Sequence, residues 1–163
     1  MSRRAFSLIE LVVVVVILGV IGAIAVPRMS GMASRAKVQG AAGAVQAVRS
    51  VIEEYRAING SPPATLGTES FYGKSRPRNP YAPLGPTDIE ILAAGVSVTE
   101  PVEKTTTASR AFWYNSDNGE FRARVADLGS ALATVELYNA VNGTSITSYS
   151  DTVDTETVGV GRD

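Results

Sequence analysis

The sequence contains neither cysteine nor histidine. Without cysteine there is no disulfide framework, no thiolate nucleophile and no cysteine-based metal site. Without histidine the chain lacks the commonest general base, the Ser-His-Asp triad and the usual zinc ligand. Only carboxylate pairs or serine–lysine pairs remain for catalysis, and the sequence has no supporting constellation of either kind. We therefore expect a protein that is not an enzyme and that has no cofactor.

An excess of charge of one sign is also missing. The 15 Lys and Arg residues nearly balance the 16 Asp and Glu residues, which gives a net charge of −1. The composition therefore provides no broad basic surface that would favour nucleic acid as a partner. The length of 163 residues is sufficient for one compact domain and an N-terminal segment.

One long apolar run occupies the N-terminus. Residues 6–26 would span about 31 Å as a helix, which matches the ~30 Å hydrocarbon core of a bilayer. Arg3 and Arg4 precede the run and favour a cytoplasmic N-terminus. We expect one membrane-spanning helix. We also expect a kink or a melted turn near residues 22–27, because Pro27 removes a backbone donor.

One carboxylate stands near the start of this run, at Glu10. On insertion scales an Asp, Lys or Arg at the centre of a membrane helix costs roughly 2.5–3.5 kcal/mol. A simple membrane anchor would have Leu or Val at this position. We therefore predict that Glu10 is a functional residue that pairs with a partner.

The apolar run has two simple interpretations. The first is a permanent single-span anchor. The second is an export signal, since Arg3 and Arg4 look like a twin-arginine signal and residues 23–25 have the A-x-A form of a signal-peptidase site. Cleavage after Ala25 would release a periplasmic binding module. Against this interpretation, Glu10 lies inside the apolar region, and Pro27 would become the second residue of the released protein.

The sequence FSLIEL at residues 6–11 closely resembles the F-[ST]-L-I-E-L signature of type IV pilins and type II secretion pseudopilins. The resemblance implies that a prepilin peptidase removes a leader of residues 1–5 by cutting between Ala5 and Phe6, and that the new Phe6 amine is methylated. Pro27 stands where the family often has proline. The family usually has glycine before the cut, where this chain has Ala5.

The resemblance also implies a function and a location. The protein would be a structural subunit of a type IV pilus or a type II secretion pseudopilus. It would be held in the inner membrane as a single-pass protein with its head in the periplasm. An inner-membrane assembly platform would then polymerise it into a homo- or hetero-oligomeric filament. The presence of Glu10 favours an ordinary repeating subunit, and the lack of cysteine favours a pseudopilin.

Elementary electrostatics supports a role for Glu10 in assembly. After the cut, the Phe6 amine and the Glu10 carboxylate are four residues apart on one helix face. In a bundle of such helices, Glu10 can meet the Phe6 amine of a neighbouring subunit inside an apolar core. Because an unpaired charge there is strongly penalised, this pairing would favour the correct register. We expect Phe6, Glu10 and Pro27 to act in assembly.

We expect the chain to divide into the leader at residues 1–5, a membrane and filament-core helix at 6–27, an amphipathic continuation at 28–60 and a head at 61–163. In the continuation, apolar residues are spaced alternately by three and four, as in a heptad seam. They are Val38, Ala41, Val45, Val48, Ile52 and Tyr55. The C-terminal half of this stripe should pack on the head. The small residues at 33–44 suit a filament core.

The predicted fold class is α+β, with the long helix packed on a small antiparallel sheet in a pilin-like layout. Residues 111–115 and 120–125 read as a hairpin around the turn at 116–119. Alternation places Phe121, Ala123 and Val125 on one face and the arginines 122 and 124 on the other. Trp113 is predicted to pack in the core or on a sheet face.

The remaining head is less regular. Residues 89–98 read as a strand, and residues 100–109 as a loop or an exposed edge. The pattern of residues 127–140 fits a helix or a strand. From Asn142 onward the composition predicts a mobile tail.

The tail carries three acidic residues, Asp151, Asp154 and Glu156. The major pseudopilin of type II secretion binds Ca²⁺ in its C-terminal loop, so these residues are candidate Ca²⁺ ligands. Their spacing matches no known Ca²⁺ loop, and the Gly/Asp-rich loop of that family with its closing tryptophan is absent. A solvated acidic tail is the favoured interpretation.

Overall fold

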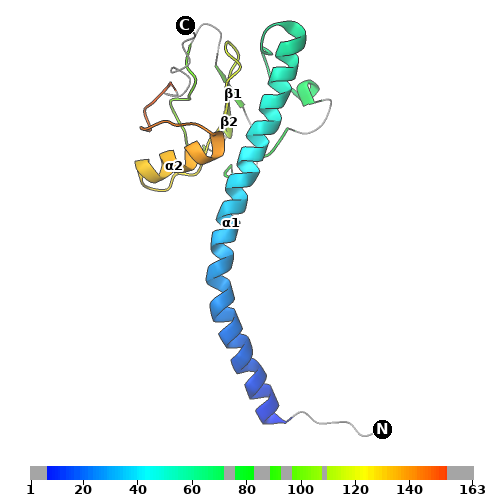
Figure 1. Cartoon of the computed structure of the whole chain (residues 1–163), viewed down its shortest axis with the longest axis vertical. Coiled ribbons are helices and arrows are strands. Elements are labelled where there is room, and N and C mark those ends of the chain that lie inside the picture. The colour runs from blue at the N-terminus through cyan, green and yellow to red at the C-terminus, as the bar shows by residue number, and fades with distance from the viewer. Residues whose placement is uncertain (1–6, 72–75, 83–88, 93–96, 108–109, 154–163) are drawn as a thin grey trace, which may run out of the picture. The chain divides into compact units, whose positions relative to one another are not determined.

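The computed structural model describes residues 7–71, 76–82, 89–92, 97–107 and 110–153. The elements in chain order are α1 (Leu8–Asn59), the short 3-10 helix η1 (Thr68–Phe71), β1 (Ile89–Leu92), β2 (Phe112–Asn115), β3 (Phe121–Ala123) and α2 (Ala131–Asn142) (Figure 1). Two compact units share the chain, Met1–Ala36 and Lys37–Asp163. We call them the N-terminal segment and the head. The first half of α1 belongs to the N-terminal segment and the second half to the head.

The heptad stripe of α1 forms one wall of the core of the head. Ala41, Val45, Val48 and Ile52 are fully buried there, as the spacing predicts, whereas Tyr55 at the end of the stripe is 42% exposed. The helix ends at Asn59, because Gly60 adopts a left-handed conformation with φ of 77° that other residues disfavour. Its amide donates to the carbonyl of Arg56 at 2.8 Å.

The backbone of α1 remains helical through Pro27. The melted turn that we expected there is therefore wrong. Proline removes a single backbone donor. The helical bonds on either side are sufficient to keep the chain in one helix.

The three strands form one sheet in the order β1-β2-β3. β2 and β3 are the predicted antiparallel hairpin, with Phe112 opposite Ala123 and Tyr114 opposite Phe121. Gly119 closes the turn with φ of 83°. The expectation of an antiparallel sheet is wrong for β1, which runs parallel to β2. A long connection from Leu92 to Phe112 returns the chain to the starting end, so the two strands point the same way.

The inner face of the sheet packs against α1. Phe112 and Phe121 stack with ring centroids 5.2 Å apart and join the same core cluster as the α1 stripe. The buried Tyr114 hydroxyl donates to the carbonyl of Pro63 at 2.6 Å and so fixes the chain just after α1. Burial raises the pKa of Tyr114 to about 12. Trp113 is buried on the opposite face, as predicted.

The segment that the sequence left undecided contains helix α2. It ends where Gly143 takes a left-handed conformation with φ of 65°. Its Asn142 lies beside the edge strand β3, where its amide group accepts from the backbone N–H of Ala123 at 2.7 Å and donates to the carbonyl of Ala123 at 2.9 Å. The side chain thereby pairs backbone groups that an edge strand would otherwise leave open.

Residues 143–153 pack onto the head, which differs from the mobile tail expected from Asn142. Ile146 is buried, and its backbone is held by both polar atoms of the Asn139 side chain. The Asp151 carboxylate accepts from the backbone amides of Thr147 and Ser148 at 2.9 and 2.8 Å. Serine and threonine are common in such tight turns, and their abundance here reflects turns rather than mobility.

Replacing Ile52 by Ala should lower the free energy of unfolding of the head by about 2–5 kcal/mol, because Ile52 is 1% exposed and fills the core. The measurement is urea unfolding of the full chain in detergent. It can be followed by the fluorescence of Trp113, the single tryptophan of the protein. Ile58→Ala is the matched control, because Ile58 is on the same helix and 76% exposed. Equal losses for the two variants would contradict this packing.

Candidate functional site

The first turn of α1 holds the predicted assembly residue Glu10. Its carboxylate Oε2 accepts from the backbone amide of Ser7 at 3.1 Å, and the carbonyl of Ser7 accepts from the amide of Glu10 at 3.1 Å. Ser7 and Glu10 match the S-x-x-E pattern of a capping box, in which the acidic side chain satisfies an open amide at the helix start. Our sequence interpretation missed this local role, although the three-residue spacing is its signal.

The predicted processing residues Ala5 and Phe6 lie outside the described residues. Glu10 is exposed in the N-terminal segment. The backbone of Pro27 is within α1, and its side chain is outside the description. The predicted contact between the Phe6 amine and Glu10 therefore remains a prediction.

The apolar part of α1 around and after Glu10 is not covered by any other part of the described chain. Residues Leu8–Ala25 have a mean hydropathy of 3.0, and none of them is buried. Among the described residues this is one helix that is long and apolar enough to cross a membrane. Its composition and exposure fit membrane anchoring. Water alone would be a poor surrounding for this surface, because exposed apolar area is unfavourable in water.

A second cluster of polar residues lies on the outer face of the sheet, opposite α1. Arg122 is buried, and its Nε donates to Glu100 Oε1 at 2.7 Å. Tyr138 of α2 donates its hydroxyl to Glu100 Oε2 at 2.5 Å. Arg122 also pairs with Glu120 beside the turn. The fully buried Glu100 carboxylate therefore joins the connection after β1, strand β3 and helix α2.

The pKa values in this cluster follow from burial and charge. Burial raises the pKa of Tyr138 well above its usual value, and the neighbouring Glu100 carboxylate raises it further. Burial alone would lower the pKa of Arg122, but the carboxylates of Glu100 and Glu120 outweigh it and raise the pKa. Arg122 is therefore held as a cation and Tyr138 as a neutral donor, which is what the contacts with Glu100 require.

Lys104 is buried beside this cluster. Its Nζ donates to the carbonyls of Pro101 and Asp151 at 2.9 and 2.6 Å. The rings of Tyr138 and Tyr149 lie 5.7 and 5.6 Å from the same nitrogen, within the range of a cation–π contact. Burial lowers the pKa of Lys104, and Glu100 opposes that shift.

Residues 100–107 form a loop with one isolated bridge at Thr105, as expected, but Glu100 and Lys104 within it are fully buried rather than exposed. Composition suggested exposure because charged residues are rarely buried unless they are paired. Apart from the carbonyl of Pro101, the partners of these two residues come from β3, α2 and residues near Asp151. Such long-range pairing leaves no local signal in the sequence.

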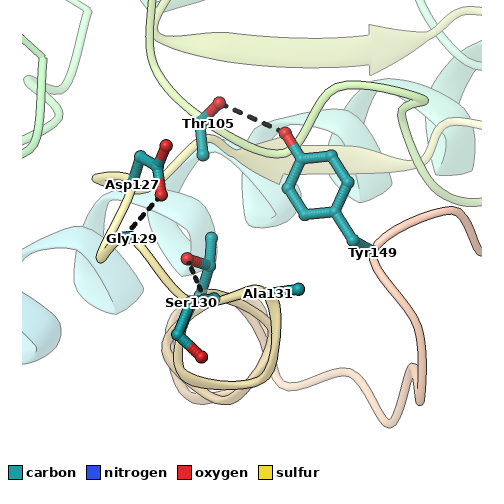
Figure 2. A pocket seen from close by; sticks show the side chains of 7 residues that line it. Thr105, Asp127, Gly129, Ser130, Ala131 and Tyr149 are labelled. Atoms are coloured by element: carbon teal, nitrogen blue, oxygen red, sulfur yellow. Dashed lines mark hydrogen bonds between the residues drawn. The ribbon is translucent and has the colours of Figure 1, made fainter.

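A polar hollow of about 300 Å³ lies at the start of α2 (Figure 2). Its polar side chains bond to their neighbours, except the exposed hydroxyl of Ser130. The Asp127 carboxylate accepts from the amide of Gly129 at 2.8 Å, and the hydroxyls of Thr105 and Tyr149 lie 3.2 Å apart. This hollow therefore provides no polar side chain that needs a ligand.

The candidate Ca²⁺ ligands are not gathered in the part of the chain that the structure describes. Asp151 caps its own turn, and hydrogen bonds from the amides of Ser148 and Thr147 hold the pKa of its carboxyl below the usual value. Asp154 and Glu156 lie outside the described residues. Within the described ranges, no group of three or more acidic side chains is close enough together to hold a metal ion.

Replacing Glu100 by Gln should lower the free energy of unfolding by about 3 kcal/mol, because it leaves the buried Arg122 cation without its fully buried partner. Urea unfolding of the full chain in detergent measures the change. Glu136→Gln, at an exposed position of α2, is the control and should change the stability by less than about 0.5 kcal/mol. A loss for Glu100→Gln no larger than that of the control would contradict the role assigned to this pair.

Comparison with known proteins adds one finding to this geometry. The family model of the prokaryotic N-terminal methylation motif matches residues 1–26. No curated protein and no solved structure matches the chain significantly. The matched residues include Glu10 and the exposed apolar helix. They do not include the head. The family is structural rather than enzymatic, and its α+β layout agrees with the long helix and small mixed sheet. The chain therefore carries the N-terminal methylation motif that is the signature of type IV pilins and pseudopilins.

Proposed function

We propose that this protein is a structural subunit of a type IV pilus-like or type II secretion pseudopilus filament. In this proposal a prepilin peptidase cuts between Ala5 and Phe6, and the Phe6 amine is methylated. The apolar helix holds the subunit in the inner membrane with the head in the periplasm. An assembly platform then moves the helix from the membrane into a filament of like or related subunits. The observation that carries the proposal is the methylation motif on an uncovered apolar helix that includes Glu10.

Exposure along the helix supports assembly through its surface. Large apolar side chains from Leu8 to Ile24 are between 49% and 81% exposed, so the described chain does not cover them. In the membrane, lipid covers this surface. In a filament, the equivalent helices of neighbouring subunits would cover it with similar apolar contacts, which allows exchange between the two environments.

The glycines of the N-terminal segment give independent support. A methyl group at Gly19, Gly22 or Gly31 would meet no atom of the described chain within 4 Å. The subunit itself therefore has room for alanine, which favours a helix by about 1 kcal/mol per residue. Glycines in such positions allow a second helix to approach closely. In the head, Gly40 packs against Pro80, whereas Gly43 has open space like the glycines of the N-terminal segment.

Glu10 would set the register in which the helices of neighbouring subunits pack. In the single chain its carboxylate accepts one neutral amide, that of Ser7. The ammonium of a neighbouring subunit's Phe6 would be a stronger partner, because charge-assisted hydrogen bonds are roughly twice as strong as neutral ones. Within an apolar bundle, registers that leave either charge unpaired would be penalised by several kcal/mol.

Processing can be tested by the mass and N-terminal sequence of the mature protein from membranes. We expect a chain that begins at Phe6 and is heavier by one methyl group. Ala5→Gly should be processed at least as completely as the native chain, because the family usually has glycine there. A chain that begins at Val26 would instead establish a released periplasmic module. An intact Met1 would establish a plain membrane anchor.

Assembly can be tested with Glu10→Ala. The variant should remain in the membrane fraction, because its helix is more apolar than the native one. Its incorporation into filaments should fall roughly tenfold or more, because the register pair is lost. The measurement compares the subunit in sheared or purified filaments with that in membranes. Glu136→Ala, at an exposed position in the head, is the control. Normal incorporation of Glu10→Ala would overturn the assigned role.

A further inference from the structure

A hollow of about 370 Å³ lies on the outer face of the sheet of the head. We call it the outer-face hollow. Strands β1 and β2 contribute Glu90 and Trp113, Arg124 comes from the end of β3, and the connection from Leu92 to Phe112 contributes Glu103 and Arg110. The hollow is separate from the N-terminal segment, so nothing in the proposed filament role assigns a use to it.

Arg124 is the unusual residue of this hollow. Its side chain is 2% exposed, and one nitrogen, Nη2, pairs with Glu90. The other two nitrogens, Nε and Nη1, are buried and have no hydrogen-bond acceptor among the described residues. Leaving buried donors of a charged group unmatched is costly, and native structures rarely do so without a reason.

Glu103 lies near Arg124 but does not hydrogen-bond to it. Its Oε2 is 3.5 Å from Arg124 Nη1, which is an ion-pair distance but too long for a good hydrogen bond. The Glu103 side chain is 48% exposed. It can therefore turn into solvent with the loss of one long ion-pair contact to Arg124. Glu103 acts as a loose cover over the guanidinium of Arg124 rather than as its fixed partner.

Carboxylates balance the guanidinium groups at the hollow when Glu103 turns away. Glu90 is shared by two cations, since its Oε1 also accepts from Arg110 at 2.7 Å. The Glu100 carboxylate also lines the hollow. Arg122 pairs with both Glu100 and Glu120, so it supplies no spare positive charge. Glu103 is therefore the carboxylate that an incoming anion has to replace.

Apart from Glu100 and Thr152, the rest of the lining is apolar. Leu92, Val98 and Val102 border the hollow together with Trp113. Val102 is 76% exposed and so offers apolar surface at its border. Pockets that combine apolar walls with a few convergent polar groups suit ligands of mixed character.

We propose that the outer-face hollow binds a small carboxylate carried on an apolar body, with the carboxylate on Arg124 and Arg110 and the apolar part against Leu92, Val98 and Val102. The incoming carboxylate replaces Glu103 at Arg124. This replacement gives Nη1 of Arg124 the charge-assisted hydrogen bond that Glu103 is too distant to make.

The test uses the full chain in detergent at low ionic strength, with 3-phenylpropionate as the probe. Binding is followed by the fluorescence of Trp113, which lines the hollow, and by calorimetry. We expect saturable binding to the native chain. Glu103→Gln should bind the probe several-fold more tightly because the competing charge is gone. Arg110→Gln should bind it about tenfold more weakly, since one charged donor is lost.

The controls separate charge recognition from general stickiness. Glu136→Gln and Arg78→Gln change exposed charges of the head away from the hollow and should bind as the native chain does. The neutral amide of the probe should bind at least tenfold more weakly than the acid. Inorganic phosphate, which has no apolar body, should also bind more weakly.

Several results would overturn the proposal. The first is that the probe shows no saturable binding either to the native chain or to Glu103→Gln. The second is that Arg110→Gln binds the probe as tightly as the native chain does. The third is that the native chain binds the acid and its neutral amide equally tightly. Tighter binding of phosphate than of the probe would reject the apolar part of the assignment. Arg110 and Glu103 are both half exposed, so replacing either one should leave the head folded. A change in the affinity for the probe therefore reports on binding. The result does not depend on filament formation.

Discussion

The head is organised around one buried ion pair, Arg122 with Glu100. An arginine on a short strand and a glutamate on an irregular connection are both costly to remove from water. Each stabilises the other there, with added contacts from Tyr138 to Glu100 and from Glu120 to Arg122. The pair joins three parts of the chain that share little local order. Through it the connection after β1 is held against the outer face of the sheet, and that arrangement creates the outer-face hollow. A hydrophobic contact would also bind these parts, but it would fix their register less strictly.

The N-terminal segment obeys a different constraint, since its apolar surface has to be covered by something outside the described chain. The head solves its own burial problem with the second half of α1, the sheet and α2. The described side chains in the first half of α1 are absent from that core and present an exposed apolar surface. The head is stable through internal packing, whereas the surface of the N-terminal segment fits membrane anchoring. In the proposed filament, the same apolar surface would serve both in the membrane and in the bundle.

Local patterns predicted much of the head. The spacing of three and four along α1 identified the buried stripe, since a helix turns once every 3.6 residues regardless of context. The turn at residues 116–119 identified the hairpin, because Gly119 tolerates a left-handed conformation. The direction of β1 and the burial of Glu100 and Lys104 were missed. The direction of β1 depends on a long connection, and each buried charge depends on partners more than ten residues away or in another element. The alternation of Arg122 and Arg124 placed them on the correct face, but the pattern did not indicate that this face is covered.

The sequence by itself identified the methylation motif of the N-terminal segment. The carboxylate in an apolar run and the FSLIEL signature are properties of residues close together in the chain, and the methylation motif is read from the same residues. The tertiary structure alone decided the chemistry of the head. Whether Arg124 has acceptors for all its donors, or whether Asn142 pairs the edge of β3, depends on where distant segments meet. That meeting is set by the packing of the whole core, because a side chain loses its contact with water only when the rest of the chain surrounds it.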